Sequence, residues 1–302
     1  MSLYPPANDH VPADLDATSW EVLQPLYADL LERPLRCSGC LESLLIDRSE
    51  LDAAASEAHA TLYIDMTCHT DDESITSRYL DHVRDVQPHL KEIGFQLDRH
   101  IVQCPHVDDL DRDRYGVLIR GMESDVNLFR EENIPLQTED TEQGTKYDEI
   151  CGAMSVTFRG EEYTMPQMAK FLQDDDREVR REAWAGTINR RYQDHEAIDT
   201  IYDDMIKLRD RMARNADCED YRDYMFKAMH RFDYTPSDCE VFHRAVEQVC
   251  IPIQHANNRS RQQALGVSTL CPWDLDVDVQ GRTPLAPFAG SDELVAKASA
   301  LF

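Results

Sequence analysis

The sequence predicts a mainly α-helical protein with one short β-hairpin. Glycine is scarce, at 11 of 302 residues, and a low glycine content favours long helices over turn-rich β architectures. Apolar residues recur at intervals of three and four along most of the chain, which is the pattern of amphipathic helices. Only residues 152–167 alternate apolar and polar side chains over a short run. We therefore expect a multi-helix assembly that is interrupted once by a pair of strands.

Two helical patterns stand out in the first third of the chain. The first contains Pro25 near its start, and its apolar face comprises Trp20, Leu23, Tyr27, Leu30 and Leu31. The second is longer, is expected to kink at Pro88, and comprises Ile75, Tyr79, Val83, Val86, Leu90, Ile93, Leu97 and Ile101. We interpret both stripes as core faces, because amphipathic helices of globular proteins bury such a stripe.

The predicted hairpin lies within residues 152–167. Met154, Val156 and Phe158 alternate with polar residues, and Arg159-Gly160 then supplies a turn before a second extended run. Thr164 with Gln167 forms a capping box that opens a helix. A further helix is expected to start at Asp175 or Asp176, with an apolar side formed by Val179, Ala183, Trp184 and Ile188.

The last third of the chain combines helix signals with an irregular segment. Thr235-Pro236 marks a helix start, whereas residues 271–288 are rich in proline and too long for a tight turn. Ser291 is the expected N-cap of a final amphipathic helix that carries Leu294, Val295, Ala298, Leu301 and Phe302. No C-cap signal follows this helix, so we expect that the sequence has been cut at its C-terminus.

Composition restricts the partners that the chain is expected to bind. The 58 acidic and 31 basic residues give a net charge of −27, which repels phosphate backbones and anionic lipids. No apolar stretch approaches the ~20 residues of a membrane span. We therefore expect neither nucleic acid nor membrane as a partner. Nine scattered cysteines and the absence of a secretory signal predict a cytoplasmic protein.

One short segment is close to a zinc-protease signature. The run from His195 to Asp199, HEAID, differs from H-E-x-x-H only in its last residue. A zinc site would need a third protein ligand, and no downstream residue on a following helix supplies one. The apolar side of this helix is also expected in a different register, formed by Ile198, Ile201, Tyr202, Met205, Leu208 and Met212. We therefore favour an ordinary polar helix start over a metal site.

Two other features are weaker candidates for metal sites. Cys37 and Cys40 form a single CxxC, which is half of a zinc motif or a redox motif, but no second pair follows it. Acidic clusters at residues 108–113 and 174–176 lack the calcium-loop pattern. We favour packing residues or surface thiols for the cysteines, and solvated loops and caps for the acidic clusters.

Several long runs of the sequence resemble the oligoendopeptidase F branch of the M3 zinc metallopeptidases. They are LYIDMTCHTDD (62–72), LFREENIPLQTE (128–139), AMSVTFRGEEYTMPQMAKFLQDDDREVRREAW (153–184), IYDDMIKLRDRMARNADCEDYRDYMF (201–226), RFDYTPSDCEVFHRAVEQV (231–249) and PWDLDVDVQGRTPLAPF (272–288). The resemblance covers nearly the whole chain after about residue 45. It implies an elongated, almost all-α molecule with a deep channel that admits oligopeptides. It also implies one zinc ion held by an H-E-x-x-H helix and a later Glu.

The sequence departs from this family at the decisive motif, because it contains no H-E-x-x-H. In the family that motif follows the Pro-rich segment, so no catalytic residue and no metal ligand can be assigned to any position here. No cofactor is expected in this chain, although zinc is expected in the full-length family member. HEAID does not replace the motif, because it precedes NADCEDYRDY instead of following the Pro-rich segment.

We therefore interpret the chain as the N-terminal portion of a zinc-dependent oligoendopeptidase that is inactive by itself. The expected division is a flexible arm (1–18), an N-terminal helical domain (19–150), and the hairpin with the first helices of a peptidase domain (151–302). Candidate contacts to peptide in the channel are Tyr221, Tyr224, His230 and Tyr234, although we favour helix packing for these side chains. Self-association through exposed apolar surface is expected. The alternative is a non-catalytic helical protein that binds peptides or a partner, and a CxxC metal protein is a third hypothesis.

Overall fold

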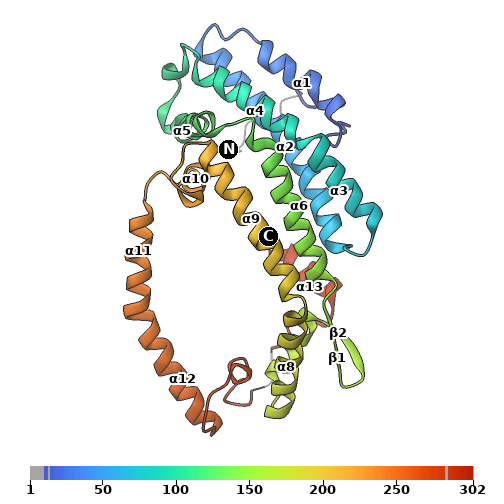
Figure 1. Cartoon of the computed structure of the whole chain (residues 1–302). Helices are drawn as coiled ribbons and strands as arrows, with labels where there is room; N and C mark the ends of the chain where they lie inside the picture. Colours follow the sequence, from blue (N-terminus) through green and yellow to red (C-terminus); the bar gives the residue numbers. More distant parts are fainter. Residues whose placement is uncertain (1–9, 13, 283–284, 302) are drawn as a thin grey trace. The chain divides into compact units, whose positions relative to one another are not determined.

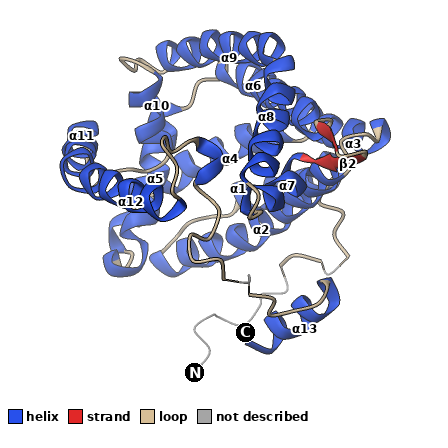
Figure 2. Cartoon of the chain, turned by 90° about the horizontal axis from the view of Figure 1, so that it is seen from below, coloured by secondary structure: helices blue, strands red, loops and turns tan. Residues whose placement is uncertain are grey.

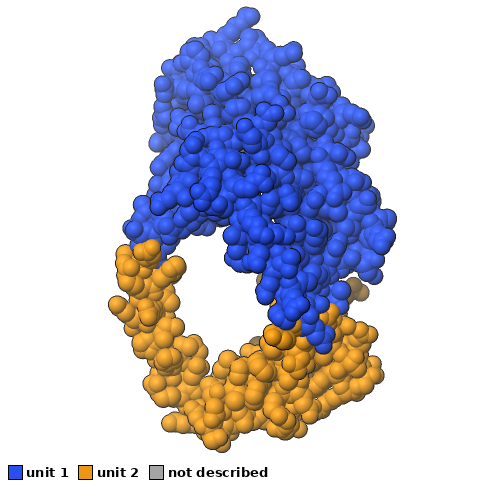
Figure 3. All heavy atoms as spheres, viewed as in Figure 1, with its two compact units in different colours: residues 1–154, 193–239 blue, residues 155–192, 240–302 orange. Residues whose placement is uncertain are grey.

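The computed structural model describes residues 10–12, 14–282 and 285–301, and this part of the chain is mainly helical (Figure 2). Its one sheet has two antiparallel strands. The predicted fold class is therefore confirmed. The chain forms two compact units: unit 1 contains residues 1–154 and 193–239, and unit 2 contains residues 155–192 and 240–302 (Figure 3). Each unit combines two separate stretches of sequence. The predicted division into residues 1–18, 19–150 and 151–302 stays a prediction.

Unit 1 is an assembly of packed helices. Its helices are α1 (Trp20–Glu32), α2 (Ser38–Cys68), α3 (Glu73–Asp85), α4 (Gln87–Val102), α5 (Arg112–Leu128), α6 (Asn133–Gly152), α9 (His195–Asn215) and α10 (Tyr221–Ala228). The first four helices pack against one another, α5 packs on α4, and α6 lies along α9 (Figure 1). One core cluster joins α1, α2 and α4 through Leu23, Tyr27, Leu30, Leu51 and Leu97. A second joins α2, α4 and α5 through Leu41, Leu44, Ile101 and Ile119.

The chain before α1 contributes to the first of these clusters. Ala17 is buried there, and Val11 and Leu15 pack against it. Residues 1–9 and 13 of the predicted arm lie outside the described residues. The apolar stripe predicted for α1 is confirmed, and Pro25 lies inside that helix.

The second predicted stripe is interrupted more strongly than expected. A kinked helix was predicted over residues 75–101, but the structure has two helices, α3 and α4, that meet at Val86. Pro88 lies in the first turn of α4, where its missing N–H leaves no intrahelical hydrogen bond unmade. The expected kink is therefore a complete break, because proline begins a new helix here instead of bending an old one.

Unit 2 is organised around the predicted hairpin, which is confirmed. Strands β1 (Ser155–Phe158) and β2 (Glu161–Thr164) pair with Val156 opposite Tyr163. Arg159 and Gly160 both have positive φ, as a two-residue type I′ turn requires. The helical elements are α7 (Met165–Met168), η2 (Ala169–Gln173), α8 (Arg177–Gln193), α11 (Pro236–Ala245), the π-helical turn η3 (Val246–Cys250), α12 (Ile251–Leu265), η4 (Pro272–Asp274) and α13 (Ser291–Leu301). Of these, α8 belongs to unit 2 up to residue 192, and α11 belongs to it from residue 240 onward. The hairpin packs on α7 and α8 through Val156, Phe158, Met168, Val179 and Ala183.

Most of the predicted helix starts agree with the structure. Gln167 accepts a hydrogen bond from the backbone N–H of Thr164 at 2.9 Å, and Asp176 accepts one from that of Glu178 at 2.9 Å. At the start of α11, the backbone N–H of Thr235 donates to the Asp238 carboxylate, and the backbone N–H of Asp238 donates to the Thr235 hydroxyl oxygen. The last helix differs by one residue, because α13 already includes Ser291. The N–H of Leu294 donates to the Gly290 carbonyl, so Gly290 takes the preceding position.

Candidate functional site

The HEAID segment forms the first turn of α9. The helix begins at His195, and Glu196 and Asp199 are exposed on it. Its buried residues are Leu208, Met212 and Ala213, whereas Tyr202, which was expected in the apolar stripe, is 59% exposed. Among the residues that the structure describes, no group of three or more His, Cys, Asp or Glu side chains is placed to hold a metal ion. The donor set around His195 therefore does not fit the zinc site that the family resemblance implies.

Two of the four candidate peptide contacts pack together on α10. Tyr224 is buried, and its hydroxyl accepts a hydrogen bond from Gln137 Nε2 at 3.3 Å. The Tyr221 ring stacks on that of Tyr224 with centroids 5.8 Å apart, and the Arg209 guanidinium lies 5.6 Å from the Tyr221 centroid. Burial raises the pKa of both hydroxyls. These contacts join α10 to α6 and α9, as the helix-packing interpretation expects.

The other two candidates lie after α10 and are exposed. His230 has a left-handed backbone (φ 52°), and its Nε2 lies 2.9 Å from Asp125 Oδ1. A Cβ on Gly121 would lie 3.0 Å from the His230 ring, so glycine allows this ring to pack on α5. Tyr234 packs edge-on against Phe226 with ring centroids 5.8 Å apart. The role of all four residues in binding peptide stays a prediction.

A cavity beside Tyr224 is lined by Lys91, a residue that no sequence pattern marks as part of a site. The cavity measures about 290 Å³, and its lining includes Lys91, Phe95, Asp98 and Tyr224. Burial lowers the pKa of the Lys91 ammonium group to about 8. The sequence of α4 does not indicate that Lys91 is buried, because a lysine at the edge of an amphipathic face usually extends its ammonium group to solvent.

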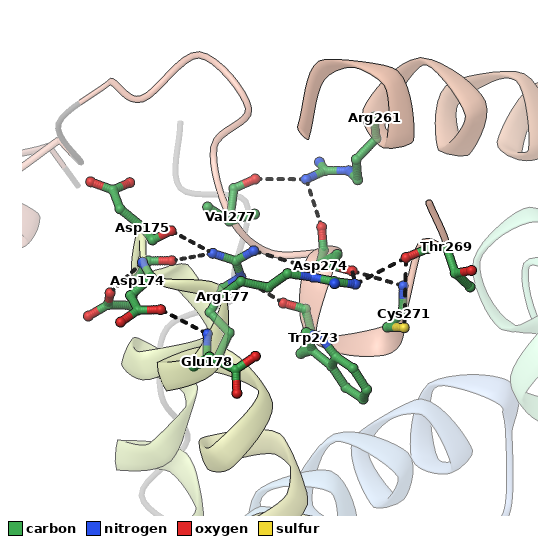
Figure 4. A network of polar contacts seen from close by, with 12 residues as sticks. Asp174, Asp175, Arg177, Glu178, Arg261, Thr269, Cys271, Trp273, Asp274 and Val277 are labelled. Atoms are coloured by element: carbon green, nitrogen blue, oxygen red, sulfur yellow. Dashed lines mark hydrogen bonds and ion pairs between the residues drawn. The ribbon is translucent and has the colours of Figure 1, made fainter. Parts of the chain in front are cut away.

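A buried polar cluster of unit 2 joins the start of α8 to the Pro-rich segment (Figure 4). Asp274 is fully buried. Its carboxylate accepts hydrogen bonds from Arg177 Nε at 3.0 Å, Arg177 Nη2 at 2.8 Å, Arg180 Nη2 at 3.2 Å and the Cys271 N–H at 2.9 Å. These contacts, led by those from Arg177, lower the pKa of Asp274 to about 2. The carboxylate is thus held ionised and fully coordinated.

Backbone carbonyls complete the same cluster. Arg180, which is 2% exposed, also donates to the carbonyls of Asp174, Asp175 and Trp273. Arg261 of α12 donates to the carbonyls of Asp274 and Val277, the second at 2.7 Å (Figure 4). The cluster therefore fixes residues 271–277 to α8 and α12. Because Asp274 has no access to solvent, we assign the cluster a positioning role and not a chemical one.

Comparisons with known proteins agree with the family resemblance. Residues 170–283, which include this cluster, match the model of peptidase family M3. The chain is similar to a putative oligoendopeptidase F from Bacillus anthracis str. Ames, with a TM-score of 0.85 and 19% identity over 96% of this chain and 53% of that one. It is similar to PZ peptidase A with a bound inhibitor, with a TM-score of 0.80 and 20% identity over 85% and 46%. A search of curated proteins finds no match.

A second putative oligoendopeptidase F structure has a TM-score of 0.87 and 18% identity over 98% of this chain and 52% of its own. The chain thus spans about half the length of the solved structures that it matches. Structural similarity at identities below 25% establishes the fold alone, and the match to the family model is limited to residues 170–283. The chain has the oligoendopeptidase F fold, and its predicted resemblance to the M3 peptidases is confirmed.

Proposed function

We propose that this chain is the N-terminal portion of a zinc-dependent oligoendopeptidase that hydrolyses short peptides, and that it does not hydrolyse them by itself. One observation carries the proposal. The fold of these peptidases extends over nearly all of this chain, yet the chain spans only about half of each matched structure. We accordingly propose that the other half supplies the chemistry.

The potential metal ligands of the chain support the proposal that the other half supplies the chemistry. Its sequence lacks H-E-x-x-H, and the described His, Cys, Asp and Glu residues form no metal-binding group. A catalytic zinc needs three protein ligands and activates a water molecule when it is bound. Since the residues present do not fit such a site, we assign no catalytic step to them. Zinc and the general base then belong to residues outside this sequence.

The contribution of this chain would be scaffold and peptide contact. We propose that oligopeptides are its small-molecule partners, with Tyr221, Tyr224, His230 and Tyr234 as candidate contacts. The net charge of −27 disfavours nucleic acid and anionic lipid, and no helix in the described residues is long and apolar enough to span a membrane. A cytoplasmic location is part of the same proposal.

An uncovered apolar stripe on unit 2 favours a missing packing partner. Phe242, Val249 and Ile253, which we call the apolar stripe, are all exposed on the run α11–η3–α12, with Phe242 at 67%. Covering a side chain of this kind stabilises a protein by roughly 1.5–3 kcal/mol. We therefore propose that this stripe drives self-association when the chain is isolated.

The proposal is tested by a hydrolysis assay. The purified chain is incubated with zinc and quenched-fluorescent oligopeptides, alongside His195→Ala and a known zinc oligopeptidase as positive control. We expect no zinc-dependent cleavage by either form of the chain. Cleavage that the substitution abolishes would show that HEAID is a metal site after all and would contradict the proposal.

The apolar stripe is tested separately with a hydrophobic dye and by sedimentation. Phe242→Gln/Val249→Gln/Ile253→Gln should lower dye fluorescence and dissociate the assemblies, whereas Gln263→Ala on the same run should change neither. A wild-type chain that is monomeric and does not increase the fluorescence of the dye would count against a missing packing partner.

The alternative, a non-catalytic helical protein that binds peptides, is favoured by the cavity beside Tyr224. Unlabelled oligopeptides should then bind the intact chain and protect Lys91 from acetylation. Absence of binding at millimolar peptide would remove this alternative, whereas tight binding without hydrolysis would favour it over the peptidase portion.

A further inference from the structure

The CxxC motif occupies the start of the longest helix of unit 1. Cys37 is the N-cap of α2, a helix of 31 residues, and Cys40 lies in the first turn. The Cys37 Sγ accepts a hydrogen bond from the backbone N–H of Cys40 at 3.3 Å. The two Sγ atoms are 2.9 Å apart, in contact with each other. The two sulfur atoms are therefore close enough to form a disulfide bond without rearrangement of the helix.

The two cysteines differ in access and in electrostatic environment. Cys37 is exposed, whereas Cys40 is partly covered. The hydrogen bonds of Cys37 with the Cys40 side chain and then with the Cys40 backbone N–H lower the pKa of the Cys37 thiol. The partial positive charge of a helix N-terminus acts in the same direction. Cys37 is thus the accessible sulfur with thiolate character, and Cys40 is the neighbour that can resolve an adduct on it.

The surroundings of the motif hold this geometry. Leu41, Leu44 and Leu45 follow Cys40 directly and are buried in the core cluster that joins α2, α4 and α5. Gly39 separates the two cysteines, and a Cβ at this position would lie 3.9 Å from the Cys37 Sγ. The motif is therefore attached to a rigid core while the Cys37 sulfur stays open to small reagents.

We propose that Cys37 and Cys40 form a redox-active dithiol that exchanges with low-molecular-weight disulfides such as glutathione disulfide. The Cys37 thiolate attacks one sulfur of the reagent, the reagent S–S bond breaks, and one glutathione thiolate leaves. Cys40 then loses its proton to solvent and attacks the Cys37 sulfur, which releases the second glutathione. The chain loses two electrons and two protons, and the reagent gains them as two thiols.

This dithiol is independent of the peptidase proposal, because it lies outside residues 170–283. A metal site at the CxxC motif would use the same sulfur atoms. A structural zinc needs four ligands, and no described group of three donors includes these cysteines. We therefore favour thiol exchange over metal binding.

The experiment uses the tryptic peptide 37–48, which contains both cysteines and none of the other seven. The intact folded chain is equilibrated with glutathione and glutathione disulfide in several ratios, quenched with acid, alkylated and digested. The reduced peptide carries two alkyl groups. As the disulfide fraction rises, we expect it to be replaced by a form without alkyl groups that is two hydrogens lighter than the unmodified dithiol, and dithiothreitol added before alkylation should restore the dialkylated form. Cys40→Ser should instead retain one glutathione on Cys37.

The control lies at the opposite end of the same helix. Cys68 is exposed and is the last residue of α2, where the helix dipole opposes a thiolate. We expect Cys37 in the reduced wild-type chain to react with iodoacetamide at neutral pH about tenfold faster than Cys68. Cys68→Ser should leave oxidation of peptide 37–48 unchanged.

Three results would overturn the proposal. The first is a peptide 37–48 that carries two alkyl groups at every glutathione ratio. The second is a Cys37 that reacts no faster than Cys68. The third is stoichiometric zinc that protects both cysteines, which would assign the pair to a metal site.

Discussion

The buried cluster around Asp274 gives the sharpest prediction for stability. Asp274→Asn keeps the size of the side chain but removes the charge that faces Arg177 and Arg180. Breaking a buried ion pair by removing one partner typically costs about 3–5 kcal/mol, because the other charge stays buried without compensation. The variant tests whether this cluster holds the Pro-rich segment on α8.

Two features of the cluster place the expected loss near the lower end of that range. The Arg177 side chain is 39% exposed, so water can solvate its guanidinium when the carboxylate is gone. Arg180 keeps three backbone carbonyl acceptors, those of Asp174, Asp175 and Trp273. We therefore expect Asp274→Asn to lower the free energy of unfolding of unit 2 by about 3 kcal/mol.

The assay can be made local to unit 2. The chain contains three tryptophans, and Trp184 and Trp273 contact each other there with ring centroids 5.3 Å apart. In a Trp20→Phe background, tryptophan fluorescence during guanidinium unfolding reports on unit 2. Equal m-values in the parent and the variant would allow the midpoints to be compared as free energies.

A matched control lies four residues further along the segment. Asp278 pairs with Arg282 at 2.7 Å, and both side chains reach solvent. Asp278→Asn should shift the transition little, since exposed ion pairs contribute little to stability. If Asp274→Asn is no more destabilising than Asp278→Asn, the buried cluster does not hold the segment and the reasoning is refuted.

The remaining predictions concern pH and packing. The folded pKa of Asp274, about 2, lies below its ordinary value of 3.8. The ionised carboxylate therefore stabilises the folded state fully above about pH 4, and this stabilisation is lost as the pH falls towards 2. Acid unfolding curves of wild type and Asp274→Asn should converge over this range, and a constant separation would contradict the pKa shift. Lys91→Met should stabilise unit 1 by roughly 1–3 kcal/mol near pH 7, because burial disfavours the charged lysine and lowers its pKa to about 8. In denaturant titrations this gain in the free energy of unfolding should vanish as the pH rises to ~10.4. A gain that persists at that pH would indicate that packing causes it. On α6, Gly152→Ala should destabilise by about 1–3 kcal/mol because its Cβ would overlap the Thr70 side chain. Gly144→Ala on the same helix meets no neighbour and should stabilise by roughly 0.5–1 kcal/mol, so melting temperatures that move in the same direction for both variants would contradict this packing argument.

Local patterns were sufficient to predict most elements of the fold. The alternation of Val156 and Phe158 with polar residues, followed by Arg159-Gly160, determined the hairpin and its turn, because backbone sterics act within a few residues. The caps at Thr164 and Asp176 were predictable for the same reason. The break at Val86 was underestimated as a kink, since the sequence does not show whether a helix before proline continues.

The parts of the site that depend on distant residues were not predictable. Asp274 is 97 residues from Arg177, and nothing in the Pro-rich segment distinguishes this aspartate from the exposed Asp276. The cavity that Lys91 lines likewise includes residues of α5, α6 and α10, which follow it in sequence. The CxxC was recognised as a pair, but only the structure shows its sulfur atoms in contact at the start of a helix.

The central proposal is that this chain forms part of a peptidase scaffold whose zinc-binding helix is encoded beyond it. Sequencing of the DNA that follows codon 302 tests this most directly. We predict that the downstream sequence, in the same frame or after an interruption, encodes a helix with H-E-x-x-H. A stop codon followed by no such sequence in any frame would contradict the claim and favour a helical protein that binds peptides without cleaving them.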